Sequence, residues 1–486
     1  TRLGGMIEQR PDWCVSRQRA WGVPITVFVN KESGEPLRDT DVFERIVQAV
    51  EAEGADAWFA SDPSRFLGDK YKVEDFDQVT DILDVWFDSG CTHAFVLEAR
   101  DDLQWPASLY LEGSDQHRGW FHSSLLESCG TRGRAPYEAV LTHGFVMAED
   151  GRKMSKSLGN TILPSDIVNV NGADILRLWV VGSDYSEDMR IGPEIIKSHT
   201  DVYRRLRNTL RYLLGNLNDF QDSDRVAYED MPELDRWVLH RLWKMDEVLR
   251  QSCETFQFHS LFTELHNFCA MDLSAFYFDI RKDALYCDAA TSLKRRAALT
   301  VLNEIFNCLT AWLAPFICFT AEEAWLMRNP GAEESVHLRL FPDIPDQWRD
   351  DQLADKWSAI RRLRRVVTGA LEVERVEKRI GSSLQSSPVV YAGAAYQDAF
   401  AGMATGDLAD LFITSGIKFA TGAAPETAFR LEDVADVAVL PKAAEGVKCQ
   451  RCWKVLEDVG SQSGHPDACP RCAQAADQHS PDVATS

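Results

Sequence analysis

Four cysteines near the end of the chain form two close pairs, and their spacing restricts the local fold more than any other feature. Two residues lie between Cys449 and Cys452 and two between Cys469 and Cys472, with sixteen residues between the pairs. A C-x2-C knuckle brings two thiolates to one ion, and a second knuckle completes a tetrahedron. The pattern therefore predicts one structural Zn²⁺ with no open position for catalysis. Four basic residues are expected to offset the charge of the thiolates: Lys448, Arg451, Lys454 and Arg471.

The other eight cysteines share no spacing and lie among apolar residues, as reduced core cysteines do. This usage favours a cytoplasmic protein over a disulfide framework. The eight are Cys14, Cys91, Cys129, Cys253, Cys269, Cys287, Cys308 and Cys318.

The length of 486 residues is too great for a single domain. At roughly 100–200 residues per domain, three or four are expected. The most apolar stretch, residues 309–319, is broken by Pro315 and is shorter than the roughly 20 residues that span a bilayer, so no membrane segment is expected. The chain starts at Thr1 without an initiator methionine, which suggests a fragment of a longer protein.

Hydrophobic periodicity divides the chain into regions that differ in predicted secondary structure. Up to about residue 190 the sequence has short apolar runs separated by Gly and Pro residues. This pattern predicts an α/β region, with strands at 24–29, 108–111 and 139–146. A more polar stretch, 30–79, reads as an insertion with a helix at 42–53. Helical spacing from about 195 to 330 predicts a bundle. A further helix at 355–380 precedes a small α/β piece with strands at 389–392 and 411–414.

The net charge of −23 argues against a nucleic-acid partner when taken alone. Phosphates respond to the local field, however, and positive charge is clustered. Solvated helix faces are an equally good interpretation of each cluster. The clusters are Arg204, Arg205, Arg207 and Arg211; Lys294, Arg295 and Arg296; Arg361, Arg362, Arg364 and Arg365; and Arg375, Lys378 and Arg379.

The segment Lys153-Met154-Ser155-Lys156-Ser157 combines two lysines with serines between flanking glycines. Such a mobile cationic loop can close on a triphosphate and neutralise the charge that develops on pyrophosphate. On chemistry alone, an ordinary Lys/Ser surface turn is the more common explanation. The written pattern, with His143-Gly144 before it and Leu158-Gly159-Asn160 after it, resembles the signature loop of class I aminoacyl-tRNA synthetases.

Three more stretches resemble the isoleucine, valine and leucine branch of that family. Residues 10–25 are similar to the segment that follows the editing insertion. Asp84-Val85-Trp86-Phe87-Asp88-Ser89-Gly90 resembles the isoleucine form best, and residues 111–121 resemble the adenylate segment at the carboxyl end of a Rossmann strand. The cysteine module, with Trp453 after Cys452, and Gly381-Ser382-Ser383-Leu384 also resemble the isoleucine-specific C-terminal region.

The resemblance implies roles for particular residues. Lys153 and Lys156 would be catalytic, acting on the ATP phosphates, and Trp86 and Trp120 would wall the amino-acid side chain. A core-packing role is the ordinary alternative for each tryptophan. ATP and adenylate binding is implied for Glu112, Gly113, Asp115, Gln116, His143, Lys153, Met154, Ser155, Lys156 and Ser157.

The implied reaction is ATP-dependent attachment of isoleucine to its tRNA through isoleucyl-adenylate. It requires L-isoleucine, ATP with Mg²⁺, and tRNA(Ile), besides the structural zinc; a monomer is expected. The expected fold is multidomain α/β plus α. It comprises a partial Rossmann catalytic domain (1–195, insertion at about 30–79) and a helical anticodon-binding domain (196–345). A helix with a small α/β C-terminal region (346–440), a zinc module (441–475) and a disordered tail (476–486) follow.

One departure from the family pattern is important. The His-x-Gly-His signature is absent from the sequence, and so is the large editing insertion. The resemblance therefore predicts the C-terminal portion of such an enzyme, inactive by itself in isoleucine activation. Two alternatives stay open: a valine- or leucine-specific synthetase, and a non-catalytic zinc- and RNA-binding protein derived from a synthetase.

Overall fold

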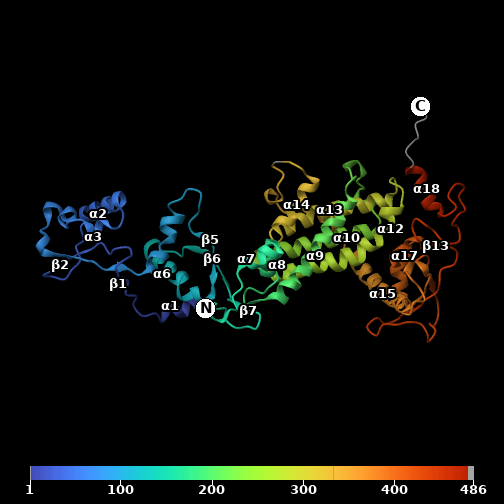
Figure 1. Ribbon diagram of the computed structural model, residues 1–486, viewed down its shortest axis with the longest axis horizontal. Helices are drawn as coiled ribbons and strands as arrows, with labels where there is room; N and C mark the ends of the chain where they lie inside the picture. Colours follow the sequence, from blue (N-terminus) through green and yellow to red (C-terminus); the bar gives the residue numbers. More distant parts are fainter. Residues whose placement is uncertain (1, 332, 480–486) are drawn as a thin grey trace, which may run out of the picture. The chain divides into compact units, whose positions relative to one another are not determined.

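The computed structural model describes residues 2–331 and 333–479, and it divides into two compact units (Figure 1). The first comprises residues 1–146 and 185–189, and the second comprises 147–184 and 190–486. Residues 480–486, part of the tail expected to be disordered, lie outside the described residues. None of the described helices is long and apolar enough to cross a membrane.

A β-α-β unit forms the centre of the first compact unit. Strand β5 (Ala107–Gly113) is parallel to β6 (Tyr137–His143), and helix α6 (Trp120–Arg132) connects them. The helix ends at Gly133, whose φ of 78° is the left-handed conformation that glycine tolerates. Helix α5 (Val85–Gly90) packs against α6. The strand predicted at 108–111 is confirmed. The Rossmann-type connection is confirmed as well, since β5 and β6 are parallel and a helical crossover joins them.

The polar stretch after residue 30 has a hydrophobic core of its own, which contains Phe28, Trp58 and Phe66. Asp39 caps α2 (Thr40–Glu53) by accepting hydrogen bonds from two backbone N–H groups, as an N-cap carboxylate does. The elements of this segment are β2 (Phe28–Asn30), α2, α3 (Ala57–Ala60), α4 (Ser64–Leu67), η1 (Gly68–Lys70), η2 (Val73–Asp75) and β3 (Phe76–Gln78). Strands β2 and β3 pair antiparallel, so the segment closes on itself.

Shorter elements complete the first unit and begin the second. In the first unit they are α1 (Arg2–Glu8), β1 (Ser16–Arg17), β4 (Ile82–Leu83), η3 (His93–Leu97) and η4 (Ser114–Arg118). The chain passes between the units after Val146 in β7 (Val146–Ala148), after Asp184, and after Met189 in β8 (Met189–Ile191). The second unit opens with η5 (Lys156–Leu158), α7 (Pro164–Asn171) and α8 (Ala173–Val181).

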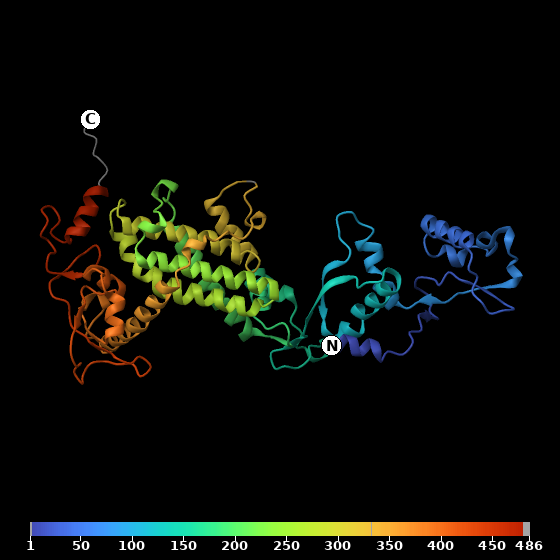
Figure 2. The ribbon, with the colours of Figure 1, turned by 180° about the vertical axis from the view of Figure 1, so that it is seen from behind.

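Long amphipathic helices form the body of the second unit, as their periodicity predicts. Helices α9 (Pro193–Asn216), α10 (Glu233–Thr255) and α13 (Leu293–Leu313) lie side by side in both views (Figures 1 and 2). Around them are α11 (Phe258–Asn267), η8 (Phe268–Phe278), α12 (Asp279–Cys287), α14 (Cys318–Arg328) and α15 (Asp351–Val376). Short turns are η6 (Asp222–Asp224), η7 (Tyr228–Asp230), η9 (Val336–Leu338), η10 (Asp346–Trp348) and η11 (Ser383–Gln385).

A small three-stranded sheet follows α15. Its central strand β9 (Val389–Ala392) pairs parallel with β10 (Lys418–Ala420) and antiparallel with β11 (Val437–Leu440). Helices α16 (Ala394–Phe400) and α17 (Thr405–Phe412) connect β9 to β10. The predicted strand at 411–414 is wrong. Leu411 and Phe412 end α17 with buried side chains, and Ile413 turns the chain with φ 56°.

The cysteine module contains β12 (Val447–Lys448), β13 (Val455–Leu456) and α18 (Pro470–His479). Strands β12 and β13 pair antiparallel around the first knuckle. In the second knuckle, Cys469 directly precedes α18 and Cys472 lies in its first turn. The expected disorder from residue 476 is wrong for 476–479, which continue α18. Ala473 and Ala475 are buried on that helix, so packing of its small apolar residues stabilises the helix although most of its sequence is polar.

Candidate active site and metal centre

The residues expected to hold an adenylate lie at the carboxyl end of β5. Glu112 is opposite Thr142 in the parallel ladder, and Gly113 is opposite His143. The Glu112 side chain is exposed and Gly113 is buried. A Cβ at Gly113 would lie 2.7 Å from Asp115 Oδ1, so glycine permits this close approach. Nucleotides bind at the carboxyl end of parallel strands in α/β sheets. The position of these residues therefore suits the sequence prediction, and their binding of an adenylate stays a prediction.

Gln116 bridges the turn after β5. Its Oε1 accepts a 2.9 Å hydrogen bond from the backbone N–H of Trp120, the first residue of α6. Its Nε2 donates to Asp115 Oδ2 over 3.3 Å. His143 points its Nδ1 to within 2.8 Å of the carbonyl oxygen of Gly144. These contacts fix the exposed carboxylate of Asp115 and the ring of His143 on the same edge of the sheet.

The structure brings the two expected pocket tryptophans together. Trp120 stacks on Tyr110 with ring centroids 4.1 Å apart and an interplanar angle of 1°. Its indole N–H donates to the Ser89 carbonyl over 2.9 Å. Trp86, which is 42% exposed, lies over Gly119, where an added Cβ would be 2.9 Å from its Cη2 atom. The Trp120 indole is therefore held by stacking and a hydrogen bond, whereas the Trp86 indole is partly exposed.

Asp84 is a site residue that sequence reasoning missed. It is buried, and it caps α5 by accepting a 3.1 Å hydrogen bond from the Trp86 backbone N–H. Its other oxygen accepts from the Trp13 indole over 3.2 Å and pairs with Arg17. Asp84 thus ties the segment 10–25 to the helix that carries Trp86. The available signal was an N-cap residue directly before an apolar helix start.

The signature loop in the second unit is braced at its base. Met147 bridges to Lys153 across the turn, and Gly151 supplies a φ of 80°. Asn160 Oδ1 accepts from the Ser155 backbone N–H over 2.9 Å, and its Nδ2 donates to the Lys153 carbonyl over 3.3 Å. The loop backbone is therefore held in shape by contacts among its own residues.

The side chains of the two lysines of that loop are exposed and take no part in the contacts that brace it. Lys153 and Lys156 are exposed, and within residues 2–331 and 333–479 neither ammonium group is paired with a carboxylate. Arg152, in contrast, pairs with Asp150 over 2.7 Å. Glu112 belongs to the other compact unit, so the meeting of loop and adenylate residues over one nucleotide stays a prediction.

The four predicted zinc ligands form one buried cluster. The Sγ atoms of Cys449, Cys452, Cys469 and Cys472 all lie within 4.8 Å of one another. The Cys452 and Cys469 sulfurs are 3.9 Å apart, close to the roughly 3.8 Å that follows from a tetrahedron with Zn–S bonds of about 2.3 Å. The backbone N–H of Cys469 donates to the Cys449 sulfur over 3.4 Å, as it would to a thiolate. The donor set fits a closed structural zinc site.

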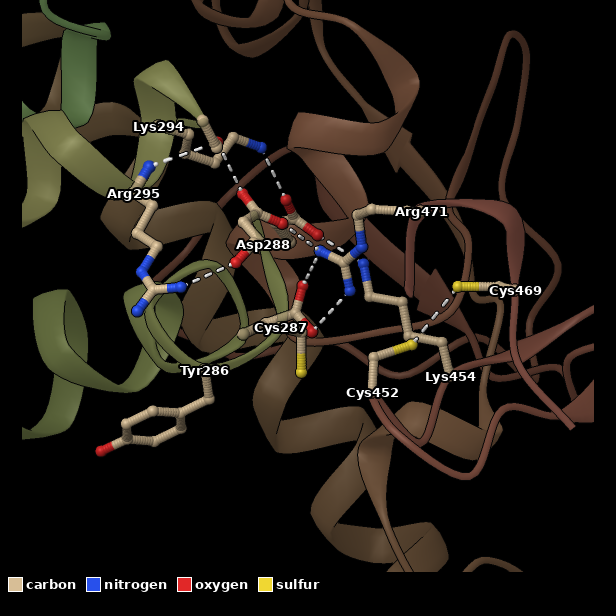
Figure 3. Close-up of polar contacts among 12 residues, drawn as sticks. Tyr286, Cys287, Asp288, Lys294, Arg295, Cys452, Lys454, Cys469 and Arg471 are labelled. Atoms are coloured by element: carbon tan, nitrogen blue, oxygen red, sulfur yellow. Dashed lines mark hydrogen bonds and ion pairs between the residues drawn. The ribbon is translucent and has the colours of Figure 1, made fainter. Parts of the chain in front are cut away.

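Basic residues of the module dock it to the helical bundle (Figure 3). Arg471 donates to Asp283 Oδ1 over 2.9 Å and to Asp288 over 3.0 Å. Arg451 donates to the carbonyl oxygens of Cys287 and Tyr286 at the end of α12.

Lys454 of the module pairs with Asp410, which also accepts from Lys294 over 2.8 Å. Lys454 and Arg471 therefore pair with carboxylates of the neighbouring elements, and Arg471 also interacts electrostatically with Cys452. That these cations offset the charge of the thiolates stays a prediction. Lys448 lies instead over the Trp453 ring, 5.7 Å from its centroid.

Cys287 is a second feature that the sequence did not reveal. It is buried at the end of α12 and packs in the same cluster as the four module cysteines. Its sulfur lies 3.7 Å from the Arg451 carbonyl oxygen. Because Cys287 and Cys449 are 162 positions apart in the sequence, no local spacing could indicate this contact. Cys14 and Cys129, also expected among core cysteines, are exposed.

Family comparisons cover most of the chain in three consecutive segments. Residues 1–192 match the tRNA synthetases class I (I, L, M and V). Residues 235–390 match the anticodon-binding domain of tRNA ligase, and 446–475 match the zinc finger found in FPG and IleRS. The last segment contains all four clustered cysteines.

Individual relatives agree with these matches. The isoleucine–tRNA ligase of Brucella abortus biovar 1 (strain 9-941) is 58% identical over 98% of this chain and 48% of the relative. That of Mesorhizobium japonicum is 56% identical over 97% of this chain and 47% of the relative. The chain thus spans about half the length of the curated relatives it matches.

A solved structure gives a likeness of fold. It is the LeuRS of Agrobacterium radiobacter K84 (agnB2), in a ternary complex with tRNA and LeuAMS, at a TM-score of 0.51 and 18% identity. The match covers 72% of this chain and 45% of that one. This likeness concerns the fold alone. The family matches and the relatives show that the chain belongs to the class I tRNA synthetases (I, L, M and V) and is similar over 98% of its length to isoleucine–tRNA ligases.

Proposed function

We propose that the chain provides part of the active site and the tRNA-binding parts of an ATP-dependent isoleucine–tRNA ligase. In the first step the isoleucine carboxylate attacks the α-phosphate of ATP, and pyrophosphate leaves with Mg²⁺. In the second, a ribose hydroxyl of tRNA(Ile) attacks the adenylate carbonyl and AMP leaves. The observation that carries the proposal is the braced loop with two unpaired lysines, on a chain 58% identical to such a ligase.

Positioning and charge neutralisation do most of the work in a reaction of this kind. Lys153 and Lys156 would neutralise the pyrophosphate as it leaves. Glu112 and Asp115 would accept hydrogen bonds from the ribose and the substrate ammonium group. Trp86 and Trp120 would contact the branched side chain. The chain by itself is expected to be inactive, because no His-x-Gly-His segment occurs in it.

A chimaera tests the proposal. This chain would replace the segment that it matches in the Brucella abortus ligase, and isoleucine-dependent ATP–pyrophosphate exchange would be measured. Lys156→Ala should lower kcat about 100-fold or more, because a charge that acts on the transition state is lost. Arg152→Ala is the matched control, since Arg152 is a cation of the same loop already paired with Asp150. An inactive chimaera, or equal losses in the two variants, would contradict the proposal.

The arginines of α9 support tRNA as the partner. In the part of the chain that the structure describes, Arg205, Arg207 and Arg211 are exposed and form no ion pair. Several members of the other basic clusters are paired, for example Arg361 with Asp272 at 2.7 Å and Arg365 with Asp433 at 2.7 Å, although Arg362 and Lys378 form no ion pair within the described residues. In a chain of net charge −23, three free guanidinium groups on one helix favour contacts with phosphates.

The salt dependence of tRNA binding would test this assignment. Replacing Arg205, Arg207 and Arg211 by alanine should weaken binding and reduce the slope of log K against log salt by about 2, at about 0.7–0.9 per lost phosphate contact. The control replaces three paired arginines: Arg361, Arg365 and Arg375. An unchanged slope in the α9 variant would exclude α9 as the phosphate-binding surface.

A further inference from the structure

Glu127 is a buried carboxyl group to which the proposed reaction assigns no role. It lies in the middle of α6 and is 9% exposed. Its Oε2 accepts a 3.0 Å hydrogen bond from the Cys91 thiol. Its Oε1 is fully buried and has no hydrogen-bond partner within the described residues. An ionised carboxylate that lacks a donor in such a position is costly.

The carboxyl group faces the end of the helix that carries Trp86. A Cβ at Gly90, the last residue of α5, would lie only 2.4 Å from Glu127 Oε1. The last carbonyl groups of a helix repel negative charge. The contact therefore suits a neutral carboxylic acid, and α5 lies closely against α6 because position 90 has no side chain.

The same short helix carries both tryptophan contacts described above. Ser89, next to Gly90, accepts the Trp120 indole hydrogen bond, and Trp86 lies over Gly119. A small displacement of α5 from α6 would change both contacts together. We propose that Glu127 is a positioning residue, which sets the separation of Trp86 and Trp120 through its contact with Gly90 and changes it when the carboxyl ionises.

The titration range supports this geometry. Burial raises the pKa of Glu127 to about 7, with Asp88 contributing in the same direction and the Cys91 hydrogen bond opposing. Burial also raises the pKa of Cys91 to about 12, so its thiol stays protonated at neutral pH. Arg132, one turn further along α6, is already paired with Glu98.

The buried histidines of this region do not explain a transition near pH 7. His93 follows α5 and His122 lies in α6, and burial lowers the pKa of both. Both are therefore neutral at the pH where Glu127 loses its proton. The expected direction is that α5 and α6 are in closest contact below about pH 7 and separate as the pH rises.

Fluorine NMR of the chain labelled with 5-fluorotryptophan tests the inference directly. The Trp86 and Trp120 signals would be assigned by W86F and W120F, with buried Trp58 as the monitor of folding. Both signals should move with a midpoint near pH 7. Glu127→Gln should abolish that transition, whereas Glu98→Gln should retain it. A transition that persists in E127Q would overturn the inference, as would constant signals in the unsubstituted chain.

A second variant keeps the test decisive if E127Q does not fold. Cys91→Ala removes the only hydrogen bond to the Glu127 side chain among the described residues, so the midpoint should rise above that of the unsubstituted chain. An unchanged midpoint would contradict the assignment.

The consequence for substrate binding rests on the proposed function. In the chimaera, KM for isoleucine should rise about threefold between pH 6 and pH 8 while KM for ATP stays constant, and E127Q should remove the rise. Equal changes in both KM values would indicate a general structural role and overturn the positioning role. An inactive chimaera would refute the proposed function, while the NMR result would still decide the role of Glu127.

Discussion

The zinc module and the β5 edge differ in how completely the chain builds each site. At the module, four buried thiols already lie at metal-binding distances, and ion pairs attach the module to α12. At the edge of β5, Glu112 and Asp115 are exposed and Trp86 is half open. A closed structural site is complete from its own residues, whereas a substrate site keeps its polar groups available for what it binds.

Metal removal should produce the largest effect. Zinc binding to such modules contributes about 10 kcal/mol or more to folding, so Cys449→Ser with Cys472→Ser should abolish bound zinc and unfold residues 446–475. Zinc content by mass spectrometry and hydrogen exchange would measure this. Cys253→Ser is the control and should retain one zinc per chain. Full protection of the module without zinc would refute its structural role.

A buried ion pair of the helical bundle should give the next largest effect. Asp235 is fully buried, accepts from the Tyr277 hydroxyl over 2.6 Å and pairs with buried Arg281. Asp235→Ala leaves the guanidinium uncompensated and should cost about 3–5 kcal/mol in the free energy of opening α10 and α12, measured by hydrogen exchange. Asp222→Ala removes an exposed partner of Arg225 and should change little.

The attachment of the module should contribute less than its metal. Arg471→Ala loses hydrogen bonds to Asp283 and Asp288 and should cost about 1–3 kcal/mol at the end of α12 while zinc is retained. Arg430→Ala, which removes a cation outside this contact, is the control. Loss of zinc in R471A would contradict this expectation, because it would show that zinc binding depends on the attachment of the module to α12.

The smallest effect is expected in the first compact unit. Trp120→Phe removes the indole donor to Ser89 but retains an aromatic ring at the position that stacks on Tyr110. The loss should be about 1 kcal/mol, read from hydrogen exchange of α6. Trp105→Phe, whose indole N–H has no partner within the described residues, should be nearly neutral. Equal losses would show that ring packing decides the stability of α6.

Local spacing was enough to predict the features that depend on near neighbours. The two knuckles, the helices of the bundle and the strand at 108–111 all follow from short-range periodicity. The strand predicted at 411–414 failed because an apolar run at the end of a buried helix has the composition of a strand. Cys287, the aspartates that bind Arg471 and the Glu127 contact depend on packing between distant segments, which a single sequence does not encode in any local pattern.

Arg451 and Arg471 occupy equivalent places, each immediately before the second cysteine of its knuckle, and both bind residues around the end of α12. Sulfur coordination therefore fixes the distance between two cations as well as the fold of the loops. A metal-free chain would keep both positive charges but lose their mutual distance. The strength with which Arg451 and Arg471 bind the end of α12 should consequently vary with zinc occupancy, even though both guanidinium charges are retained.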